Sequence, residues 1–347
     1  MKRYTNQEIA EALKDWPVRF KSYAQANKSK AIWQIITSYG PFIAMWVLMY
    51  FSLQWSYVFT LLLAFLNAFF VVRIFIIQHD CGHRSYFKSQ KLNRFVGWVS
   101  SIFTFIPYKY WSQVHDFHHG HNGQLETRDI GDIMTMTVQE YREASKGKRL
   151  AYRLFRMPLI TFGIGPMIYL LWNNRMTFVK LKGWKRDRWW LQLNNVLLIA
   201  AYALAGYLIG WKTFFLIQIP IIFFFSVIAV WFFFVQHQHE FSYKQWRKNW
   251  DYLMSAIRGS SYYKLPKLVH WLSGNIGYHH IHHLNSKIPS YNLARCAKEN
   301  PDLQEYVTSI RFFESLKLMF NKLWDEETER MITFREFYQR ERQLTAM

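Results

Sequence analysis

The sequence predicts an all-α integral membrane protein, with four transmembrane helices in two hairpins and a helical cytosolic cap that holds a two-metal site. Three observations predict this fold: long apolar runs, very short connectors between paired runs, and histidine clusters outside the runs. Hydrophobic residues make up 51% of the 347 residues, yet mean hydropathy is only -0.11. A comparable amount of polar chain must therefore lie outside the bilayer as a cap.

Four apolar runs are each close to the roughly 20 residues that a transmembrane helix requires. They cover 32–53, 57–77, 191–209 and 214–235, and the last reads FFLIQIPIIFFFSVIAVWFFFV without a charge. The connectors QWS at 54–56 and GWKT at 210–213 are so short that the runs form two hairpins. The first 30 residues carry seven Lys or Arg, which predicts a cytoplasmic N-terminus and external connectors. No apolar stretch typical of a signal peptide opens the chain.

Two weaker apolar stretches, 95–107 and 159–172, are too short to cross upright and favour interfacial or re-entrant helices. The charged tail beyond Pro301 predicts an amphipathic helix on the cap. We expect one domain over 1–347. Its parts are an N-terminal segment (1–31), the first hairpin (32–77), a cytosolic or interfacial region (78–190), the second hairpin (191–235) and a C-terminal cytosolic region (236–347).

The formal net charge of +20 fits an anionic lipid surface, a nucleic acid or an acidic protein. The apolar runs favour lipid and an acidic protein over nucleic acid. Cys81 and Cys296 are too few and too far apart for a disulfide framework or a thiolate metal site, and they fit a reducing cytosolic face.

The thirteen histidines include three groups with helical spacing. HDCGH contains His79 and His83, HDFHH contains His115, His118 and His119, and HHIHH contains His279, His282 and His283. Offsets of three and four residues place side chains on one helical face, so each group can point its imidazoles at a common centre. Eight or nine convergent imidazoles suit two metal ions, although imidazole alone does not choose among Zn, Cu, Fe and Ni.

His237, directly after the fourth run, is a ninth candidate ligand by its position. A lone interfacial histidine is usually a hydrogen-bonding surface residue, and His79 and His83 taken alone fit that role and metal binding about equally well. Packing gives little reason to repeat adjacent histidines at the same spacing, so the other two groups indicate metal binding. We leave His121, His239, His270 and His280 out of the predicted metal site. His280 follows His279 directly, so on a helix its side chain points about 100° away from that of His279.

Metal-bound histidines usually donate their second ring N–H to a carboxylate or carbonyl. The carboxylates close enough in sequence are Asp80, Asp116, Asp129, Asp132 and Glu240, each of which fits a solvated acidic residue equally well. Asn275 in SGNIGY can orient a ligand or hold a water, but a turn role is favoured.

These motifs resemble the three histidine boxes of the membrane fatty acid desaturase family, and the similarity covers most of the chain. RIFIIQHDCGH, VQHQHE and YKLPKLVHWLSGNIGYHHIHHLNSKIPSYNL resemble bacterial acyl-lipid desaturases in particular, including delta-5 phospholipid desaturases. One departure is His239, where we expect an aromatic residue in related bacterial sequences. The boxes identify the superfamily and leave the double-bond position open.

The resemblance implies a di-iron centre on the eight box histidines, with His237 as an additional ligand, and oxygen-dependent removal of two hydrogens from an acyl chain of a membrane phospholipid. It also implies the plasma membrane, with the site on the cytoplasmic face. The sequence has no His-Pro-Gly-Gly haem motif, dinucleotide fingerprint or cysteine cluster, so the electrons require a separate carrier such as an acidic ferredoxin or flavodoxin.

Two other functions fit parts of the pattern. A hydroxylase or other monooxygenase on the same scaffold has the same histidine spacing, and only the resemblance favours desaturation. A membrane metal transporter or sensor needs ionisable residues along its spans, whereas these spans hold mainly Arg73, near an end. Whether the acyl group arrives on a lipid or on a carrier stays open.

Overall fold

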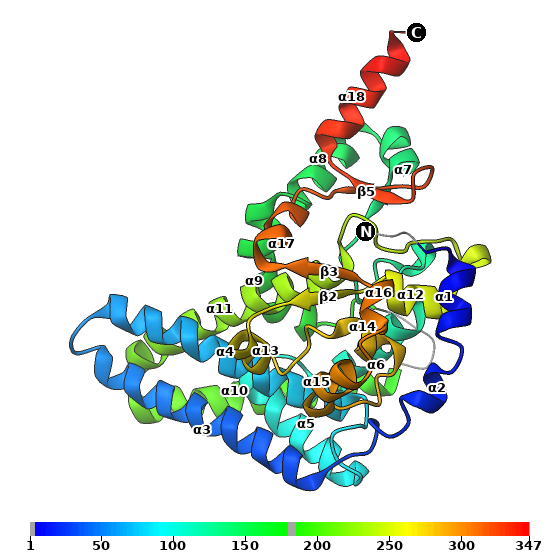
Figure 1. The fold of residues 1–347 in the computed structure, drawn as a ribbon. Coiled ribbons are helices and arrows are strands. Elements are labelled where there is room, and N and C mark those ends of the chain that lie inside the picture. Colours follow the sequence, from blue (N-terminus) through cyan, green and yellow to red (C-terminus); the bar gives the residue numbers. More distant parts are fainter. Residues whose placement is uncertain (1–3, 180–184, 347) are drawn as a thin grey trace.

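The four predicted spans are helices that extend to one side of the molecule, while shorter helices and strands form the other side (Figure 1). The computed structural model describes residues 4–179 and 185–346. Lys2 and Arg3, two of the seven basic residues behind the predicted orientation of the N-terminus, lie outside the described residues. Four single helices in this part of the chain are long and apolar enough to cross a membrane, which confirms the four predicted spans. They are α3 (Lys28–Ser52), α4 (Tyr57–Gly82), α10 (Lys185–Ile209) and α11 (Trp211–His237).

Helices α4 and α11 form the centre of the membrane part. In the most apolar windows of α4 and α11, 61% and 50% of the residues are buried, against 22% in α3 and 17% in α10. The two central helices therefore pack mainly on protein, whereas α3 and α10 turn most of their apolar side chains outward. In a bilayer that outward face contacts lipid.

The connectors of both hairpins are tight. In the first, the Ser52 hydroxyl lies 2.7 Å from the Thr60 hydroxyl, and Ser56 caps α4 by accepting from the Phe59 N–H. In the second, Gly210 alone separates α10 from α11, with φ +87°. The predicted connector at 210–213 was therefore too long. Glycine adopts positive φ without steric cost, so the chain reverses at one residue and α11 begins at Trp211.

Both central helices end at the same side of the molecule, because His83 at the end of α4 and His237 at the end of α11 both lie beside α6 (Tyr108–His121). The chain must therefore cross the membrane an even number of times between these ends. Helices α10 and α11 supply two crossings. The bent pair of Lys146–Phe155 and Ile160–Arg175, which meet at 52°, consequently stays on one side, as the interfacial or re-entrant interpretation of 159–172 requires.

The other weak apolar stretch forms α5 (Gln90–Thr104), which connects α4 to α6. Among the described residues, α5 is not a candidate membrane span. The remaining helices build the cap and its border with the membrane. They are α1 (Asn6–Ala12), α2 (Trp16–Arg19), α7 (Val138–Glu143), α8 (Lys146–Phe155), α9 (Gly165–Leu171), α12 (Tyr252–Arg258), α13 (Lys267–Leu272), α14 (His279–Leu284), α15 (Ser290–Glu299), α16 (Leu303–Tyr306), α17 (Phe312–Leu318) and α18 (Phe334–Thr345). A π-helical turn, η2 (Ile160–Ile164), links α8 to α9.

In the part of the chain that the structure describes, five short strands reinforce the cap without forming a closed sheet. They are β1 (Met136–Thr137), β2 (Ser261–Lys264), β3 (Thr308–Arg311), β4 (Leu323–Asp325) and β5 (Arg330–Ile332). Strand β2 pairs in parallel with β3, with Tyr263 opposite Ile310. Strand β4 lies between β1 and β5, parallel to the first and antiparallel to the second.

The prediction that the tail beyond Pro301 is an amphipathic helix was wrong for part of the tail. Only α18 in the region expected to be helical is a long amphipathic helix, because the LWD and RMI segments before it form the β4–β5 hairpin. Leu323 and Ile332 of this hairpin are buried with Met136 and Phe337 in one hydrophobic cluster. Pairing with β1, which lies far away in sequence, overrides the local charge pattern that favoured helix.

Arg73, an arginine inside α4, joins the cap to the membrane part. Its guanidinium donates to the carbonyl of Trp271 and to the Ser38 and Thr37 hydroxyls, and it stacks 3.9 Å from the centre of the Trp271 ring. The charge is thus hydrogen-bonded within the protein, as a charge at membrane depth must be. This role is structural, since Arg73 fastens α13 against α4.

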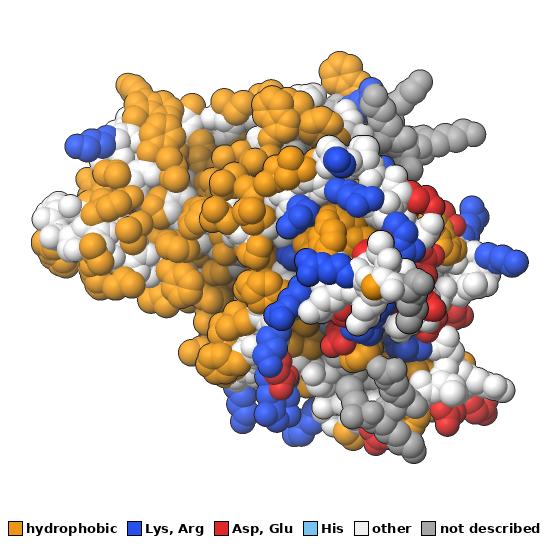
Figure 2. Space-filling view, turned by 90° about the horizontal axis from the view of Figure 1, so that it is seen from above, with side chains coloured by type: hydrophobic (Ala, Val, Ile, Leu, Met, Phe, Trp, Pro, Cys, Tyr) orange, Lys and Arg blue, Asp and Glu red, His pale blue; other side chains and the backbone are white. Residues whose placement is uncertain are grey.

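The surface reflects the same division. Seen from above, hydrophobic side chains cover the half formed by the long helices, whereas Lys, Arg, Asp and Glu gather over the cap and its border (Figure 2). This distribution suits a protein with one part in lipid and the other in water.

A topology measurement tests the parity argument. We expect tags between Lys88 and Lys91, near Lys146 and at the C-terminus to report one face, and a tag at Trp211 to report the other, because two hairpins each return the chain to its starting side. Protease accessibility of the tags in sealed vesicles measures this. Opposite faces for the Lys88 and Lys146 tags would contradict the fold and the common histidine site.

Candidate metal centre

Nine histidines from four helices converge between the ends of the central spans and the cap. The end of α4 supplies His79 and His83, the end of α11 supplies His237, and α6 and α14 supply three each. The six from α6 and α14 are His115, His118, His119, His279, His282 and His283. All nine are at most 9% exposed. The structure therefore brings together every histidine that the sequence singled out as a candidate ligand.

The imidazoles form two groups, each of which could hold one metal ion. In the first group, His79, His83, His115, His119 and His282 place one ring nitrogen each within 4.8 Å of the others, and His118, His237 and His283 do so in the second group. His279 adjoins the second group, because its Nε2 lies 2.8 Å from that of His237 and 3.1 Å from that of His283. Both groups combine histidines from different boxes.

The spacing of the nitrogens fits metal binding. Two nitrogens bound to one ion at about 2.1 Å lie about 3.0 to 3.4 Å apart in octahedral or tetrahedral geometry. The closest Nε2 pairs are His118–His237 at 3.3 Å, His115–His119 at 3.1 Å, His119–His282 at 3.0 Å, His237–His279 at 2.8 Å and His279–His283 at 3.1 Å. Four of these distances lie within that range and the fifth, between His237 and His279, lies just below it, as expected for ligands that share a cation.

Three histidines have a partner for the second ring nitrogen, which fixes the proton on Nδ1. His79 Nδ1 lies 3.0 Å from Asp80, His83 Nδ1 lies 3.2 Å from Asp116, and His237 Nδ1 donates to the Gly259 carbonyl over 3.0 Å. Nε2 of each ring then carries a lone pair directed into the cluster. His83 Nε2 is buried and has no hydrogen-bond partner among the described residues, so a cation is the partner that fits it.

The cluster favours neutral imidazoles, the form that binds metals. Burial lowers the pKa of His118 to about 4, although the nearby Asp132 opposes the shift. Burial also lowers the pKa of His83 to about 4 despite its bond to Asp116. Burial and the neighbouring imidazoles hold the pKa of His119 and His282 well below the usual value. At neutral pH the lone pairs are therefore available.

The four histidines left out of the predicted site lie outside both groups. His121 stacks on Phe117 with ring centres 3.9 Å apart, and His270 stacks on Tyr278 with ring centres 4.8 Å apart. His239 and His280 are fully buried, and burial lowers the pKa of each to about 3.

Of the five carboxylates considered as orienting groups, Asp80 and Asp116 contact candidate ligands. Asp132 lies 4.0 Å from Lys244, Glu240 lies 3.5 Å from Arg330, and Asp129 is exposed. Asn275 has φ +63° at a turn, which confirms the favoured turn role over a contact with a ligand.

The sequence did not reveal two further contributors. The Gly259 carbonyl orients His237, and a backbone carbonyl leaves no sequence signal. The Ser290 N–H donates over 2.6 Å to Asp80, so the start of α15 holds the carboxylate that in turn orients His79. The SKIPSYNL segment contains this residue, but its local pattern indicates only a helix start.

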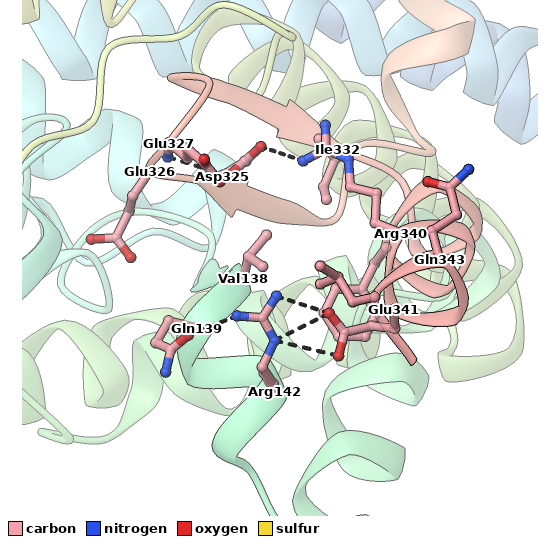
Figure 3. Close-up of a pocket in the computed structure, with 12 residues that line it drawn as sticks. Val138, Gln139, Arg142, Asp325, Glu326, Glu327, Ile332, Arg340, Glu341 and Gln343 are labelled. Carbon is pink, nitrogen blue, oxygen red and sulfur yellow. Dashed lines mark hydrogen bonds and ion pairs between the residues drawn. The ribbon is translucent and has the colours of Figure 1, made fainter. Parts of the chain in front are cut away.

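A groove of about 460 Å³ lies elsewhere in the cap, between α7, the β4–β5 hairpin and α18, and none of the nine histidines lines it. Arg142 spans this groove to bind Glu341 at 2.8 Å (Figure 3). Its ion pairs hold α18 against the cap, so the groove has no part in the metal centre.

Comparisons with known proteins indicate the family of this chain. Residues 53–314 match the family described as "Fatty acid desaturase". A "Fatty acid desaturase" of Bacillus subtilis is 40% identical over 331 residues, or 95% of this chain and 93% of that protein. An "sn-1 oleoyl-lipid 12-desaturase" of Synechocystis is 29% identical over 63% of this chain and 62% of that protein. An "sn-1 acyl-lipid omega-3 desaturase (ferredoxin)" of Nostoc is 27% identical over 73% and 69%, respectively.

The Gly259 contact can be tested by substitution. A Cβ at position 259 would lie 2.4 Å from the Ser255 carbonyl, so Gly259→Ala should shift the backbone and break the bond to His237. Loss of such a contact typically weakens metal affinity by roughly 10- to 100-fold. Metal titration of the purified protein measures this.

Gly120→Ala is the matched control, because Gly120 follows His119 directly and a Cβ there meets nothing within 4 Å. Equal metal affinity for Gly259→Ala and wild type would show that the Gly259 carbonyl does not orient His237.

Proposed function

The chain belongs to the fatty acid desaturase family and is a fatty acyl desaturase of the membrane, and on this basis we propose that it uses two irons and oxygen to introduce a double bond into acyl chains of membrane lipids. The observation that carries the proposal is the pair of histidine groups, whose nitrogens lie at ligand distances from one another. The relatives named above are all desaturases, which favours this reaction over hydroxylation or metal transport.

We assign one iron to each histidine group. The first would be held by His79, His83, His115, His119 and His282, and the second by His118, His237, His279 and His283. Bound iron supplies the redox chemistry with oxygen that no side-chain acid or base can provide for an unactivated methylene. The choice of iron over zinc rests on this reaction, because imidazole binds both.

The overall reaction balances with an external reductant. Two adjacent methylenes of the acyl chain each lose one hydrogen, and the C–C single bond becomes a double bond. These two hydrogens, two electrons from a carrier and two protons reduce one oxygen molecule to two waters. The chain therefore needs one oxygen molecule and two electrons for each double bond.

Aromatic side chains wall the histidine cluster on the side of the central spans. The Trp111 ring stacks 4.4 Å from His115, Phe233 lies 5.4 Å from His118 and 4.9 Å from His237, and Phe75 packs on Trp111 at 5.0 Å. These rings exclude water from the cluster and offer an apolar surface to a hydrocarbon chain. An acyl chain that enters from the bilayer therefore fits this side.

The proposed electron donor is an acidic carrier such as a ferredoxin or flavodoxin. A net charge of +20 supports it, and the Nostoc relative is named as a ferredoxin enzyme. We place the protein in the plasma membrane as one desaturase domain, with the cap on the cytoplasmic face, because the basic N-terminal segment favours that side.

Metal analysis tests the cofactor. Protein purified without chelators should contain close to two irons per chain when fully active, because each histidine group provides enough ligands for one ion. Elemental analysis alongside turnover measures this, and zinc-loaded protein should be inactive since zinc has no redox chemistry. Full activity with a single metal would contradict the two-iron site.

Fatty acid profiling tests the reaction and the ligands. Cells that express the chain should gain an unsaturated fatty acid in their lipids, and mass spectrometry locates its double bond. His118→Ala, His119→Ala, His282→Ala and His283→Ala should each abolish the product while the protein remains in the membrane, because the spans are unchanged. A hydroxylated product would favour the monooxygenase alternative, and full activity of any variant would remove that histidine from the site.

A further inference from the structure

Helix α4 ends in an unusual backbone conformation next to a candidate ligand. Arg84, which follows His83, has φ +62°, and the Ser85 N–H donates back to the Asp80 carbonyl over 3.0 Å. This is the C-terminal capping geometry that glycine normally provides, because other L-residues resist positive φ. Arginine at this position is therefore unfavourable for the local backbone, and its side chain should have another role.

The guanidinium of Arg84 acts on the contact between Asp116 and His83. Arg84 binds one carboxylate oxygen of Asp116 at 3.1 Å, while the other oxygen lies 3.2 Å from His83 Nδ1. The Arg84 and Asp116 side chains are 59% and 39% exposed. Asp116 alone thus lies between the exposed Arg84 side chain and His83 of the first histidine group.

Lys287 approaches the same point from a different segment. Its ammonium group donates over 2.6 Å to the backbone carbonyl of His83, and the residue is exposed. Lys287 lies four residues after His283. One cation therefore follows the first histidine box and the other follows the third. The two cations flank the single carboxylate Asp116 and leave a positive local charge.

The other orienting groups of the cluster are inaccessible. The Asp80 side chain is 2% exposed, and the Gly259 carbonyl lies in the buried bonds of His237 and Asn122. Among the side chains that the structure describes, Asp116 is the solvent-exposed partner of a candidate ligand. A protein docked over it would come within one side chain of the metal centre.

We propose that Arg84 and Lys287, around Asp116, form the docking surface for the acidic one-electron carrier. This inference rests on the proposed function, in which reduced carrier is oxidised twice for each double bond. Opposite charges across an interface speed encounter and fix orientation. Docking here gives an electron the short route through Asp116 and His83.

Apolar neighbours distinguish this surface from a lipid contact. Lys91 and Arg94 alternate with Leu92 and Phe95, which are 42% and 65% exposed, and such a mixed stretch suits the membrane interface. No exposed large hydrophobic residue lies between Leu66 and Leu92 or between Trp271 and Phe312 in the described chain. Arg84 and Lys287 therefore lie in chain segments without exposed large hydrophobic residues, which favours a hydrated protein partner over lipid.

The test uses full-length, iron-loaded enzyme in detergent and an acidic [2Fe–2S] ferredoxin. Arg84→Glu and Lys287→Glu should each weaken ferredoxin binding by roughly tenfold and reduce its salt dependence. Binding to immobilised enzyme and stopped-flow oxidation of reduced ferredoxin measure these effects. Lys146→Glu is the control, since this exposed cation on α8 makes the same charge change away from the histidines and should leave binding unaltered.

Arg84→Gly separates charge from folding. Glycine relieves the positive φ, so this variant should melt no lower than wild type and keep its iron, yet lose ferredoxin affinity. Unchanged ferredoxin affinity in all three variants would overturn the docking surface. So would weakened binding to phosphatidylglycerol vesicles alone, which marks a lipid contact, or loss of iron, which marks a role confined to positioning His83.

The result for the wild type distinguishes the two proposals. Product formation with dithionite but none with ferredoxin would overturn the docking inference and leave the desaturase function standing. Absence of an unsaturated product with either reductant would overturn the proposed function. A fall in the ferredoxin-driven rate relative to the dithionite-driven rate, in the Arg84 and Lys287 variants but not in Lys146→Glu, is the expected result.

Discussion

The structure depends on the burial of nine imidazoles, seven of which place their Nε2 about 3 Å from that of a neighbour, as ligands of a shared ion do. Without a cation, several lone pairs would face one another in a site that water does not reach, and this arrangement is unfavourable. The cluster also requires α4 and α11 to end side by side, with α6 and α14 across their ends. The membrane part therefore holds the ends of α4 and α11 next to each other on the same side of the molecule.

That requirement explains the order of segments along the chain. Each hairpin leaves the site and returns to it, so the long polar segments can all remain on the side of the histidines. The bent segment from Lys146 to Arg175 keeps this order only if it does not cross. Arg73 then joins the two parts, because its bonds to α13 and α3 connect the box-three region to the spans.

Much of the arrangement could be predicted from sequence because the decisive signals are local. Apolar length predicts the spans, and the three- and four-residue offsets predict which histidines share a helical face. Signals that depend on distant partners were missed. The β4–β5 segment was expected to be helical because its pairing with Met136–Thr137 leaves no local pattern, and the Gly259 carbonyl has no side chain to reveal its role.

The contacts behind the ligands differ between the interior and the surface of the protein. Asp80 is enclosed between His79 and the start of α15, so it can orient its histidine without contact with water. Asp116 performs the same task at the surface, where burial would not hold it in place. Arg84 pairs with this carboxylate at the surface, despite a backbone conformation that favours glycine. The unfavourable residue is therefore best understood through its side chain, which places a cation where the histidine cluster comes close to the charged surface.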